Sequence, residues 1–236
     1  MLLRAWRTIR RTVFGFIARQ PRIPHWLDRT RSSLPRRVLG PIQRATFRYE
    51  YRGMKCVKNP FDLALYALLI GRVQPRTIVE VGSGKGGSAL WFADQMRAYG
   101  LPPNVVSVDI QPVVDVAEEG VRFLAGDIHN LPASDLPAIL AVCPRPLMII
   151  EDGPHTFESC LESLQFFDGH LRSGEFIVVE DGILRDLGLK SLDNGPNRAI
   201  AEFMDANADK YVVDRTYCDF FGHNATWNTN GYLRRL

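Results

Sequence analysis

The sequence has few cysteines and no long hydrophobic run. Its four cysteines, Cys56, Cys143, Cys160 and Cys218, form no Cys-x-x-Cys pair, a pattern typical of reduced, mostly structural thiols. No apolar stretch approaches the roughly 20 residues that a membrane span needs, and no apolar segment precedes a small-residue cleavage site. These absences favour a cytoplasmic protein over a secreted or membrane-spanning one.

Acidic residues are almost missing from the first part of the chain. Residues 1–48 contain twelve Arg and one Asp, a balance of +11, whereas the net charge of the whole 236-residue chain is +3, so residues 49–236 carry −8. An acidic body offers no second basic surface to complete a nucleic-acid groove. We therefore expect no nucleic acid as a partner.

An amphipathic basic helix is predicted for residues 1–20. Its apolar residues recur at spacings of three and four, and its arginines lie largely elsewhere on the helical wheel. Such a helix either packs on the protein body or on a second subunit, or lies on an anionic membrane surface. Four prolines between positions 21 and 41 then break up a strap with room for one short helix. We expect residues 1–50 to form this appendage and residues 51–236 to form one α/β domain.

A glycine-rich turn over residues 77–89 marks the centre of that domain. An apolar, β-branched run ends in glycines and continues into a helical pattern, which predicts a buried strand, a tight turn and a helix whose free N–H groups face a ligand. Gly82-x-Gly84-x-x-Gly87 fits the dinucleotide fingerprint. With Glu80, the same turn also resembles the first motif of S-adenosylmethionine (SAM) methyltransferases. A bare strand-to-helix connection is the third interpretation, and the glycines alone do not decide.

Short apolar strands alternate with helical patterns in the rest of the domain. They are predicted at 105–109, 121–124, 147–150 and 176–179, which is typical of a parallel sheet covered on both faces. The segments 211–214 and 231–234 leave no room for a crossover helix between them, so we expect an antiparallel pair. The predicted fold is an α/β, Rossmann-like, doubly wound, mostly parallel seven-stranded sheet with a C-terminal antiparallel pair. That ending favours a SAM methyltransferase over a NAD-dependent oxidoreductase.

Acidic residues follow the predicted strands at the edge where ligands of such sheets bind. Asp109 ends the second strand, where a carboxylate can accept hydrogen bonds from both ribose hydroxyls, and Asp127 follows the third strand, near the expected adenine rim. Each of these two residues could instead be a helix cap or a turn residue.

A second group of acids predicts a metal site. Asp152 follows one strand, and Glu180 and Asp181 follow the next, so three carboxylates would share one small space and repel one another. A divalent cation relieves this repulsion, and oxygen ligands favour Mg²⁺, or else Mn²⁺ or Ca²⁺. Two alternatives remain open: Glu180 and Asp181 cap the next loop and pair with Arg185, or Glu151 takes the place of Asp152.

His155 follows Asp152 through a Gly-Pro turn that can direct the imidazole toward the acidic edge. Imidazole titrates near neutrality and can take a proton from a hydroxyl group. A lone histidine in a loop is more often a surface residue, but one beside a metal site is a candidate general base.

From Tyr51 onward the sequence resembles the metal-dependent SAM O-methyltransferases that include the mycobacterial rhamnosyl O-methyltransferases and the cephalosporin hydroxylase proteins. The resemblance rests on four motifs. The first comprises residues 79–82 and 86–89, and the second comprises residues 152–155. The third comprises residue 174 and residues 178–181, and the fourth comprises residues 221–222, 226–228 and 231–233. Residues 1–50 match no pattern of this family. The resemblance implies Mg²⁺ bound by Asp152, Glu180 and Asp181. It also implies a general base at His155, as in the related macrolide-sugar methyltransferases. The expected SAM site comprises Glu80, Gly82, Ser83, Gly84, Gly87, Ser88, Asp109 and Asp127.

The resemblance also implies a sugar hydroxyl as the acceptor, on a glycoside, a glycolipid or a polysaccharide. Two segments, 184–196 and 220–230, are expected to shape its pocket, and His223 and Trp227 suit contacts to a saccharide. Three alternatives are a non-sugar acceptor such as a phenol or a β-lactam, a NAD-dependent oxidoreductase, and a non-catalytic module docked on membranes. A homo-oligomer is the expected assembly.

Overall fold

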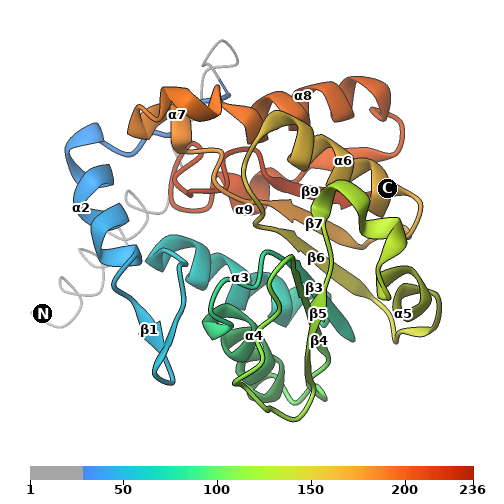
Figure 1. Ribbon diagram of the computed structural model, residues 1–236. Coiled ribbons are helices and arrows are strands. Elements are labelled where there is room, and N and C mark those ends of the chain that lie inside the picture. The colour runs from blue at the N-terminus through green and yellow to red at the C-terminus, as the bar shows by residue number, and fades with distance from the viewer. Residues whose placement is uncertain (1–28) are drawn as a thin grey trace, which may run out of the picture.

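A seven-stranded sheet forms the centre of the computed structural model, which describes residues 29–236 (Figure 1). The basic helix expected over residues 1–20 lies outside the described residues. The strand order is β5-β4-β3-β6-β7-β9-β8. Strand β9 is antiparallel to β7 and β8, and the other neighbouring strands are parallel. This arrangement confirms the predicted fold. The strands are β3 (Thr77–Val81), β4 (Val105–Asp109), β5 (Val121–Ala125), β6 (Leu147–Glu151), β7 (Phe176–Val179), β8 (Tyr211–Val213) and β9 (Tyr232–Arg235).

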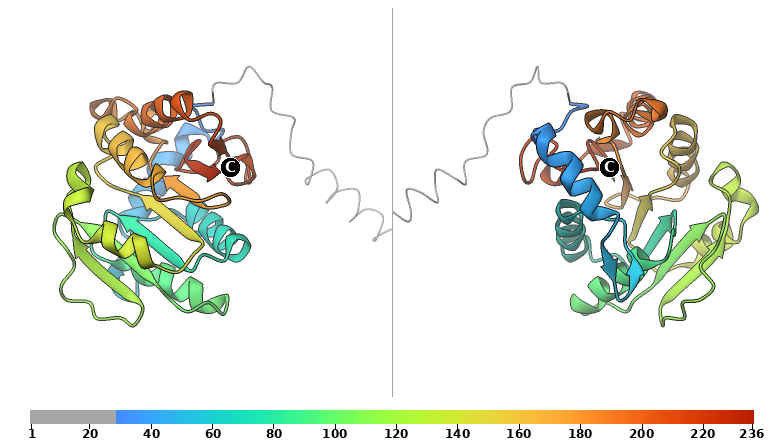
Figure 2. Two further views of the ribbon diagram at one scale, coloured as in Figure 1. Left: turned by 90° about the vertical axis from the view of Figure 1, so that its right-hand side faces the viewer. Right: turned by 60° about the vertical axis from the view of Figure 1, so that its left-hand side comes forward.

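Helices cover both faces of the sheet (Figures 1 and 2). The helices α3 (Pro60–Val73), α4 (Gly87–Ala98) and α9 (Arg215–Cys218) pack on one face, and α5 (Leu136–Val142), α6 (Phe157–Asp168) and α8 (Gly195–Ala206) pack on the other. Alternate residues of each central strand enter opposite cores. In β6, for example, Ile150 joins the core under α3 and α4, and Ile149 joins the core under α6. Burial on both faces explains why these strands read as uninterrupted apolar runs.

The register of the parallel strands brings their carboxyl ends to one edge. Val81 of β3 lies opposite Val108 of β4 and Glu151 of β6, and Glu151 lies opposite Val179 of β7. The residues that follow these positions therefore emerge side by side. The acids predicted at the strand ends all belong to this edge.

Helix α2 (Arg36–Thr46) forms where the sequence predicts an irregular strap with one short helix. It continues through Pro41, although proline removes one intrahelical hydrogen bond. The buried Leu39 of α2 packs in a small core with Ile183 and Trp227, and this packing compensates for the weak helical sequence. A hairpin of β1 (Glu50–Tyr51) and β2 (Met54–Lys55) follows α2. The remaining elements are η1 (Ile128–Ala133), α7 (Leu184–Leu187) and η2 (Lys190–Leu192).

Between residues 29 and 236, every helix is too short or too polar to span a bilayer.

Candidate active site

A cavity of about 700 Å³ lies at the carboxyl edge of the sheet. Its floor is made by the ends of β3, β4, β6 and β7, and its walls include α2, α7 and the loop that carries Trp227. Four of the residues expected to bind SAM line it, together with all of the residues expected to bind the metal and the expected base: Gly82, Gly84, Asp109, Asp127, Asp152, His155, Glu180 and Asp181.

The glycines of the turn serve different purposes. A Cβ at Gly82 would lie 2.0 Å from the backbone oxygen of Asp152, so this glycine permits the close approach of β3 to the segment after β6. Gly84 has a φ of 52° and open space where its Cβ would be, and it lines the cavity. The backbone that a ligand can approach is therefore at Gly84. Gly87 and Ser88 are buried at the start of α4 and are not among the residues that line the cavity.

Glu80 and Ser83 lie beneath the cavity rather than in its wall. Both side chains are buried, and the hydroxyl of Ser107 on β4 joins them at 2.7 Å from Ser83 Oγ and 2.7 Å from Glu80 Oε2. In the structure, each of these two side chains forms a hydrogen bond with Ser107. Their expected contact with SAM stays a prediction.

Asp109 and Asp127 do line the cavity, and each also stabilises its own turn. Asp109 accepts hydrogen bonds from the backbone N–H of Gly84 at 3.1 Å and of Gln111 at 3.0 Å. Asp127 caps η1 by accepting from His129 N at 2.9 Å. The capping role and an exposed position at the cavity are compatible, because a carboxylate has several acceptor sites.

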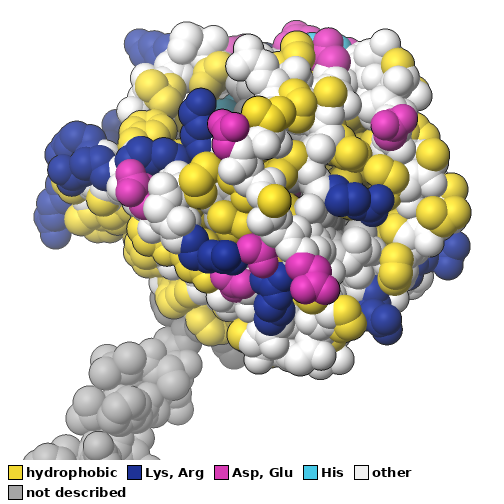
Figure 3. Space-filling model, turned by 60° about the horizontal axis from the view of Figure 1, so that its bottom comes forward, with side chains coloured by type: hydrophobic (Ala, Val, Ile, Leu, Met, Phe, Trp, Pro, Cys, Tyr) yellow, Lys and Arg dark blue, Asp and Glu magenta, His cyan; other side chains and the backbone are white. Residues whose placement is uncertain are grey.

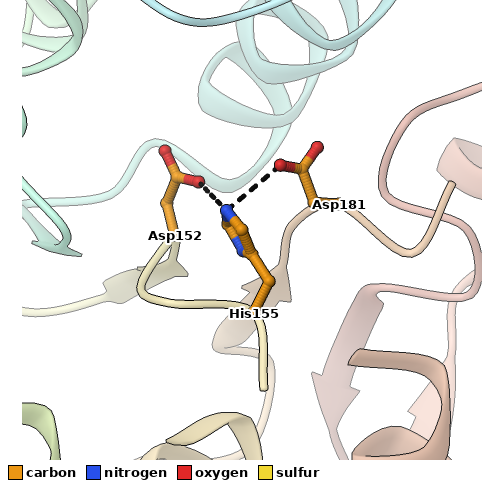
Figure 4. Close-up of side chains that lie close together, drawn as sticks. All are labelled: Asp152, His155 and Asp181. Carbon is orange, nitrogen blue, oxygen red and sulfur yellow. Dashed lines mark ion pairs between the residues drawn. The ribbon is translucent and has the colours of Figure 1, made fainter. Parts of the chain in front are cut away.

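Asp152, His155 and Asp181 converge on one point in the lining of the cavity (Figure 4). Asp152 follows β6, His155 lies in the loop after it, and Asp181 follows β7. The Nε2 atom of His155 is 3.1 Å from Asp181 Oδ2 and 3.8 Å from Asp152 Oδ1. One ligand atom from each of the three residues lies within 4.8 Å of the other two. The prediction did not place the imidazole between the two carboxylates.

Two residues of this group have left-handed backbones. The φ angles are 60° at His155 and 59° at Asp181, an uncommon conformation for residues with a Cβ. The first residue of α8, Gly195, packs directly against the His155 loop, because a Cβ there would lie 2.5 Å from His155 O. Tertiary packing therefore holds the imidazole toward the two carboxylates.

Lys58 is a residue of this site that sequence reasoning missed. Its side chain is 1% exposed, and its Nζ lies 2.5 Å from Asp152 Oδ2 and 2.6 Å from Glu180 Oε1. The hydroxyl of Tyr66 on α3 also donates to Glu180 Oε1 at 2.6 Å. The structure thus places Glu180 behind the Asp152–His155–Asp181 group, in contact with a lysine and a tyrosine. The sequence held one indication that a further cation is needed: the three predicted metal ligands carry more negative charge than one divalent ion can neutralise.

The charged groups around Lys58 have perturbed pKa values. Burial raises the pKa of Asp152 to about 8, and the Lys58 ammonium acts against this rise. Burial and the nearby Asp152 raise the pKa of Glu180 well above its usual range, against the same ammonium. Burial alone would lower the pKa of Lys58, but the surrounding carboxylates raise it well above its ordinary value. Lys58 is therefore a fixed positive charge and not a proton acceptor.

The side chains of Asp152, His155 and Asp181 suit a hard divalent cation. Two carboxylates and one imidazole converge, and Mg²⁺ and Mn²⁺ prefer oxygen ligands with room for water or substrate. Glu180 has a second oxygen beyond the one that Lys58 and Tyr66 hold. The residues present therefore fit such an ion.

Another part of the lining is mainly apolar and includes residues from both segments expected to shape an acceptor pocket. Trp227 anchors this wall by donating from Nε1 to Gln43 Oε1 at 2.5 Å and by stacking on Phe61. His223, in contrast, is buried against Arg29 and does not line the cavity. Helix α2 contributes part of the wall, which sequence reasoning did not predict. The wall residues include Gln43, Thr46, Phe47, Leu184, Leu189, Leu192 and Trp227.

Comparison with known proteins agrees with this geometry. The family model Rhamnosyl O-methyltransferase/CmcI matches residues 43–236. The rhamnosyl O-methyltransferase of Mycobacterium leprae is 29% identical over 190 residues, which cover 78% of this chain and 82% of the relative. The protein of the same name from Mycobacterium tuberculosis is 26% identical over 191 residues, covering 78% of this chain and 77% of the relative.

The solved structures lead to the same family. A structure of CmcI with Mg and SAM is 25% identical and has a TM-score of 0.62, covering 80% of this chain and 77% of that one. A structure of CmcI with SAH, the demethylated product of SAM, has a TM-score of 0.59. These matches disfavour the oxidoreductase alternative. The chain belongs to the rhamnosyl O-methyltransferase/CmcI family, which confirms the resemblance found in its sequence and the expectation of a SAM-dependent O-methyltransferase.

Proposed function

We propose that the protein transfers a methyl group from SAM to a sugar hydroxyl in a reaction that requires a divalent cation, preferably Mg²⁺. One observation carries the proposal: the open Gly84 turn, Asp109, and the Asp152–His155–Asp181 group line one continuous cavity. A methyl donor over the turn and a hydroxyl beside the carboxylates would therefore share a single chamber. The names of the relatives and the solved structure with Mg and SAM support the same reaction.

In this proposal the residues divide into three roles. Gly84, Asp109 and Asp127 hold SAM, with Glu80, Ser83, Gly82, Gly87 and Ser88 shaping the turn behind it. Asp152 and Asp181 supply metal ligands, and Glu180 joins them through the oxygen that Lys58 and Tyr66 do not hold. When bound, the metal ion orients an acceptor hydroxyl and makes it more acidic.

His155 Nε2 accepts the proton of the acceptor hydroxyl. The acceptor oxygen then attacks the methyl carbon of SAM, and the S–C bonding pair returns to sulfur as SAH forms. Alignment of the two substrates within one cavity supplies much of the rate enhancement.

Replacement of Asp181 tests the metal role. Asp181→Ala should abolish Mg²⁺-dependent methylation and leave the SAM affinity nearly unchanged, because Asp181 contacts His155 and not the glycine turn. Activity would be followed by SAH formation with a panel of glycosides, and SAM binding by calorimetry. Asp193→Ala, which removes an exposed carboxylate, is the matched control. Full activity of Asp181→Ala, or of the wild type in excess EDTA, would refute the metal role.

The proposed acceptor is a sugar. A sugar is supported by the names of the relatives and by the indole of Trp227, since saccharides stack on aromatic rings. The expected homo-oligomer, the cytoplasmic location and the membrane contact of residues 1–20 stay predictions.

A further inference from the structure

A buried lysine sits at the centre of the acidic edge. Lys58 lies between β2 and α3, and its ammonium contacts carboxylates from three neighbouring strands. Asp152, after β6, and Glu180, after β7, accept its hydrogen bonds, and Glu80 Oε1 of β3 is 3.7 Å away. Glu80 Oε1 has no hydrogen-bond partner within residues 29–236. Three acids from three strands thus depend on one cation.

The position of this cation differs from that of the metal-binding group. Lys58 approaches Asp152 at Oδ2, whereas His155 lies closest to Oδ1. The lysine therefore holds Asp152 from behind and leaves its other oxygen toward the cavity. Burial of an unpaired charge is costly, and removal of one partner of a buried ion pair strongly destabilises a protein.

The number of carboxylates also explains why a single divalent metal ion cannot neutralise this group. Glu80, Asp152, Glu180 and Asp181 carry four negative charges when ionised, and a divalent ion offsets two of them. Lys58 offsets a third, because its Nζ lies 2.5 Å from Asp152 Oδ2, 2.6 Å from Glu180 Oε1 and 3.7 Å from Glu80 Oε1. Among residues 29–236, no other lysine or arginine forms an ion pair with these carboxylates, so the metal-free protein relies on Lys58 for this charge.

We propose that Lys58 is a positioning residue that acts as the permanent counter-ion of the acidic edge, so that the metal-free protein keeps the metal-binding carboxylates in place. The inference rests on the proposed function, because that function assigns Asp152 and Glu180 to the metal. In Lys58→Met, stability should depend on the divalent ion, which takes over the missing positive charge.

The test is thermal unfolding of the full chain in EDTA and in saturating Mg²⁺. In EDTA, the melting temperature of Lys58→Met should fall by about 10 °C, as expected for loss of a buried ion pair in a protein of this size. Addition of Mg²⁺ should raise its melting temperature at least twice as much as that of the wild type.

Two variants serve as matched controls. Arg145→Met removes another largely buried cation, which pairs with Glu175 at the opposite edge of the sheet. It should lower the melting temperature and leave the Mg²⁺ shift at the wild-type value. Lys55→Met removes an exposed lysine that pairs with Glu50, and it should change neither quantity.

A double variant covers the case in which Lys58→Met does not fold. Lys58→Met combined with Glu180→Gln removes one positive and one negative charge, so it should fold in EDTA and melt above Lys58→Met. A double variant that is no more stable than Lys58→Met, or that is equally unfolded, would overturn the inference.

The remaining outcomes separate this inference from the proposed function. An equal Mg²⁺ shift in wild type and Lys58→Met overturns the counter-ion role and leaves the metal site intact. Absence of a Mg²⁺ shift in the wild type and in all variants overturns both.

Discussion

His155 lies where two chemical roles overlap. Its Nε2 faces both Asp152 and Asp181, so the same nitrogen could accept a proton or bind a metal ion. Its Nδ1 is buried and has no hydrogen-bond partner within the described residues 29–236. Fixed on one side by packing and open on the other, the imidazole presents only Nε2 to the cavity.

A substitution separates these roles. If His155 is the general base, His155→Ala should lower kcat by about 10²- to 10⁴-fold and change the Mn²⁺ affinity little. Steady-state kinetics and Mn²⁺ titration followed by electron paramagnetic resonance give the two quantities. His129→Ala removes another histidine that lines the cavity but pairs with the exposed Glu162. A large loss of Mn²⁺ affinity in His155→Ala alone would assign His155 to the metal instead.

Asp62 is a buried acid outside the catalytic group. It joins the start of α3 to the Trp227 loop by accepting hydrogen bonds from Thr226 Oγ1, Trp227 N and Asn59 Nδ2. Burial raises the pKa of Asp62 to about 6, although these donors favour its ionised form. Its folded-state pKa is thus above the value of about 3.9 in an unfolded chain.

The sign of this shift predicts a pH dependence. A raised pKa means that the folded state binds the proton more tightly, so the contribution of Asp62 to stability is complete below about pH 4 and is lost as the pH rises through 6. Relative to Asp62→Asn, the free energy of unfolding of the wild type should fall by about 2–3 kcal/mol between pH 4 and pH 7. Urea unfolding of both proteins measures the difference. A constant difference across this range would contradict the prediction.

At the scale of elements, the strands were predictable and their long-range partners were not. The runs from Val105 and from Phe176 read as strands because burial on both faces demands continuous apolar sequence. The acids at the strand ends share an edge because parallel strands end together. Lys58 and α2 reach the same edge from elsewhere in the chain, through tertiary packing that has no local signature. The left-handed backbone conformations of His155 and Asp181 could not be predicted either, because neither residue is a glycine.

The end of α6 is tied to the antiparallel strands by Asp168. Its carboxylate accepts from Lys210 Nζ at 3.1 Å, from Tyr211 Oη at 3.1 Å and from Arg235 Nη1. Partial burial tends to raise the pKa of Asp168, but these donors outweigh it and lower the pKa below its usual value. The contribution of Asp168 to stability is therefore present above about pH 4 and lost as the pH falls through the folded-state pKa.

Asp168→Asn should weaken this connection between elements. The free energy of unfolding at pH 7 should fall by about 1–3 kcal/mol, as for loss of hydrogen bonds to a charged group. The difference from the wild type should shrink as the pH is lowered below about 4. Chemical denaturation at both pH values provides the measurement, with the exposed Asp205→Asn as the control. Equal stability of Asp168→Asn and the wild type at pH 7 would show that the network contributes nothing.

On the scale of the whole molecule, one group of basic side chains lies beside α2. Figure 3 shows a cluster of Lys and Arg side chains at the left of the face in view, the side on which α2 lies in Figure 1, and further basic side chains elsewhere on that face. The exposed residues Arg36, Arg37 and Arg44 belong to this helix. The basic residues of the sequence from 1 to 48 thus continue onto the folded domain beside one wall of the cavity.

Contact with an anionic membrane, one of the two fates considered for residues 1–20, can be tested with lipid vesicles. The full chain should sediment with vesicles that contain phosphatidylglycerol, and a chain without residues 1–20 should sediment less, because it loses five arginines and an apolar stripe. Neutral phosphatidylcholine vesicles are the control. Unchanged sedimentation after the deletion would show that residues 1–20 have another role.

The late position of β9 in the chain has a consequence during synthesis on the ribosome. β9 lies between β7 and β8, so the apolar β7 has an open edge until residue 235 has left the exit tunnel. The loop that carries Trp227 comes directly before β9, and its contacts with Gln43, Phe61 and Asp62 are to residues synthesised much earlier. Until β9 is inserted, the open edge of β7 in a nascent chain is therefore available for pairing with chaperones and with neighbouring chains.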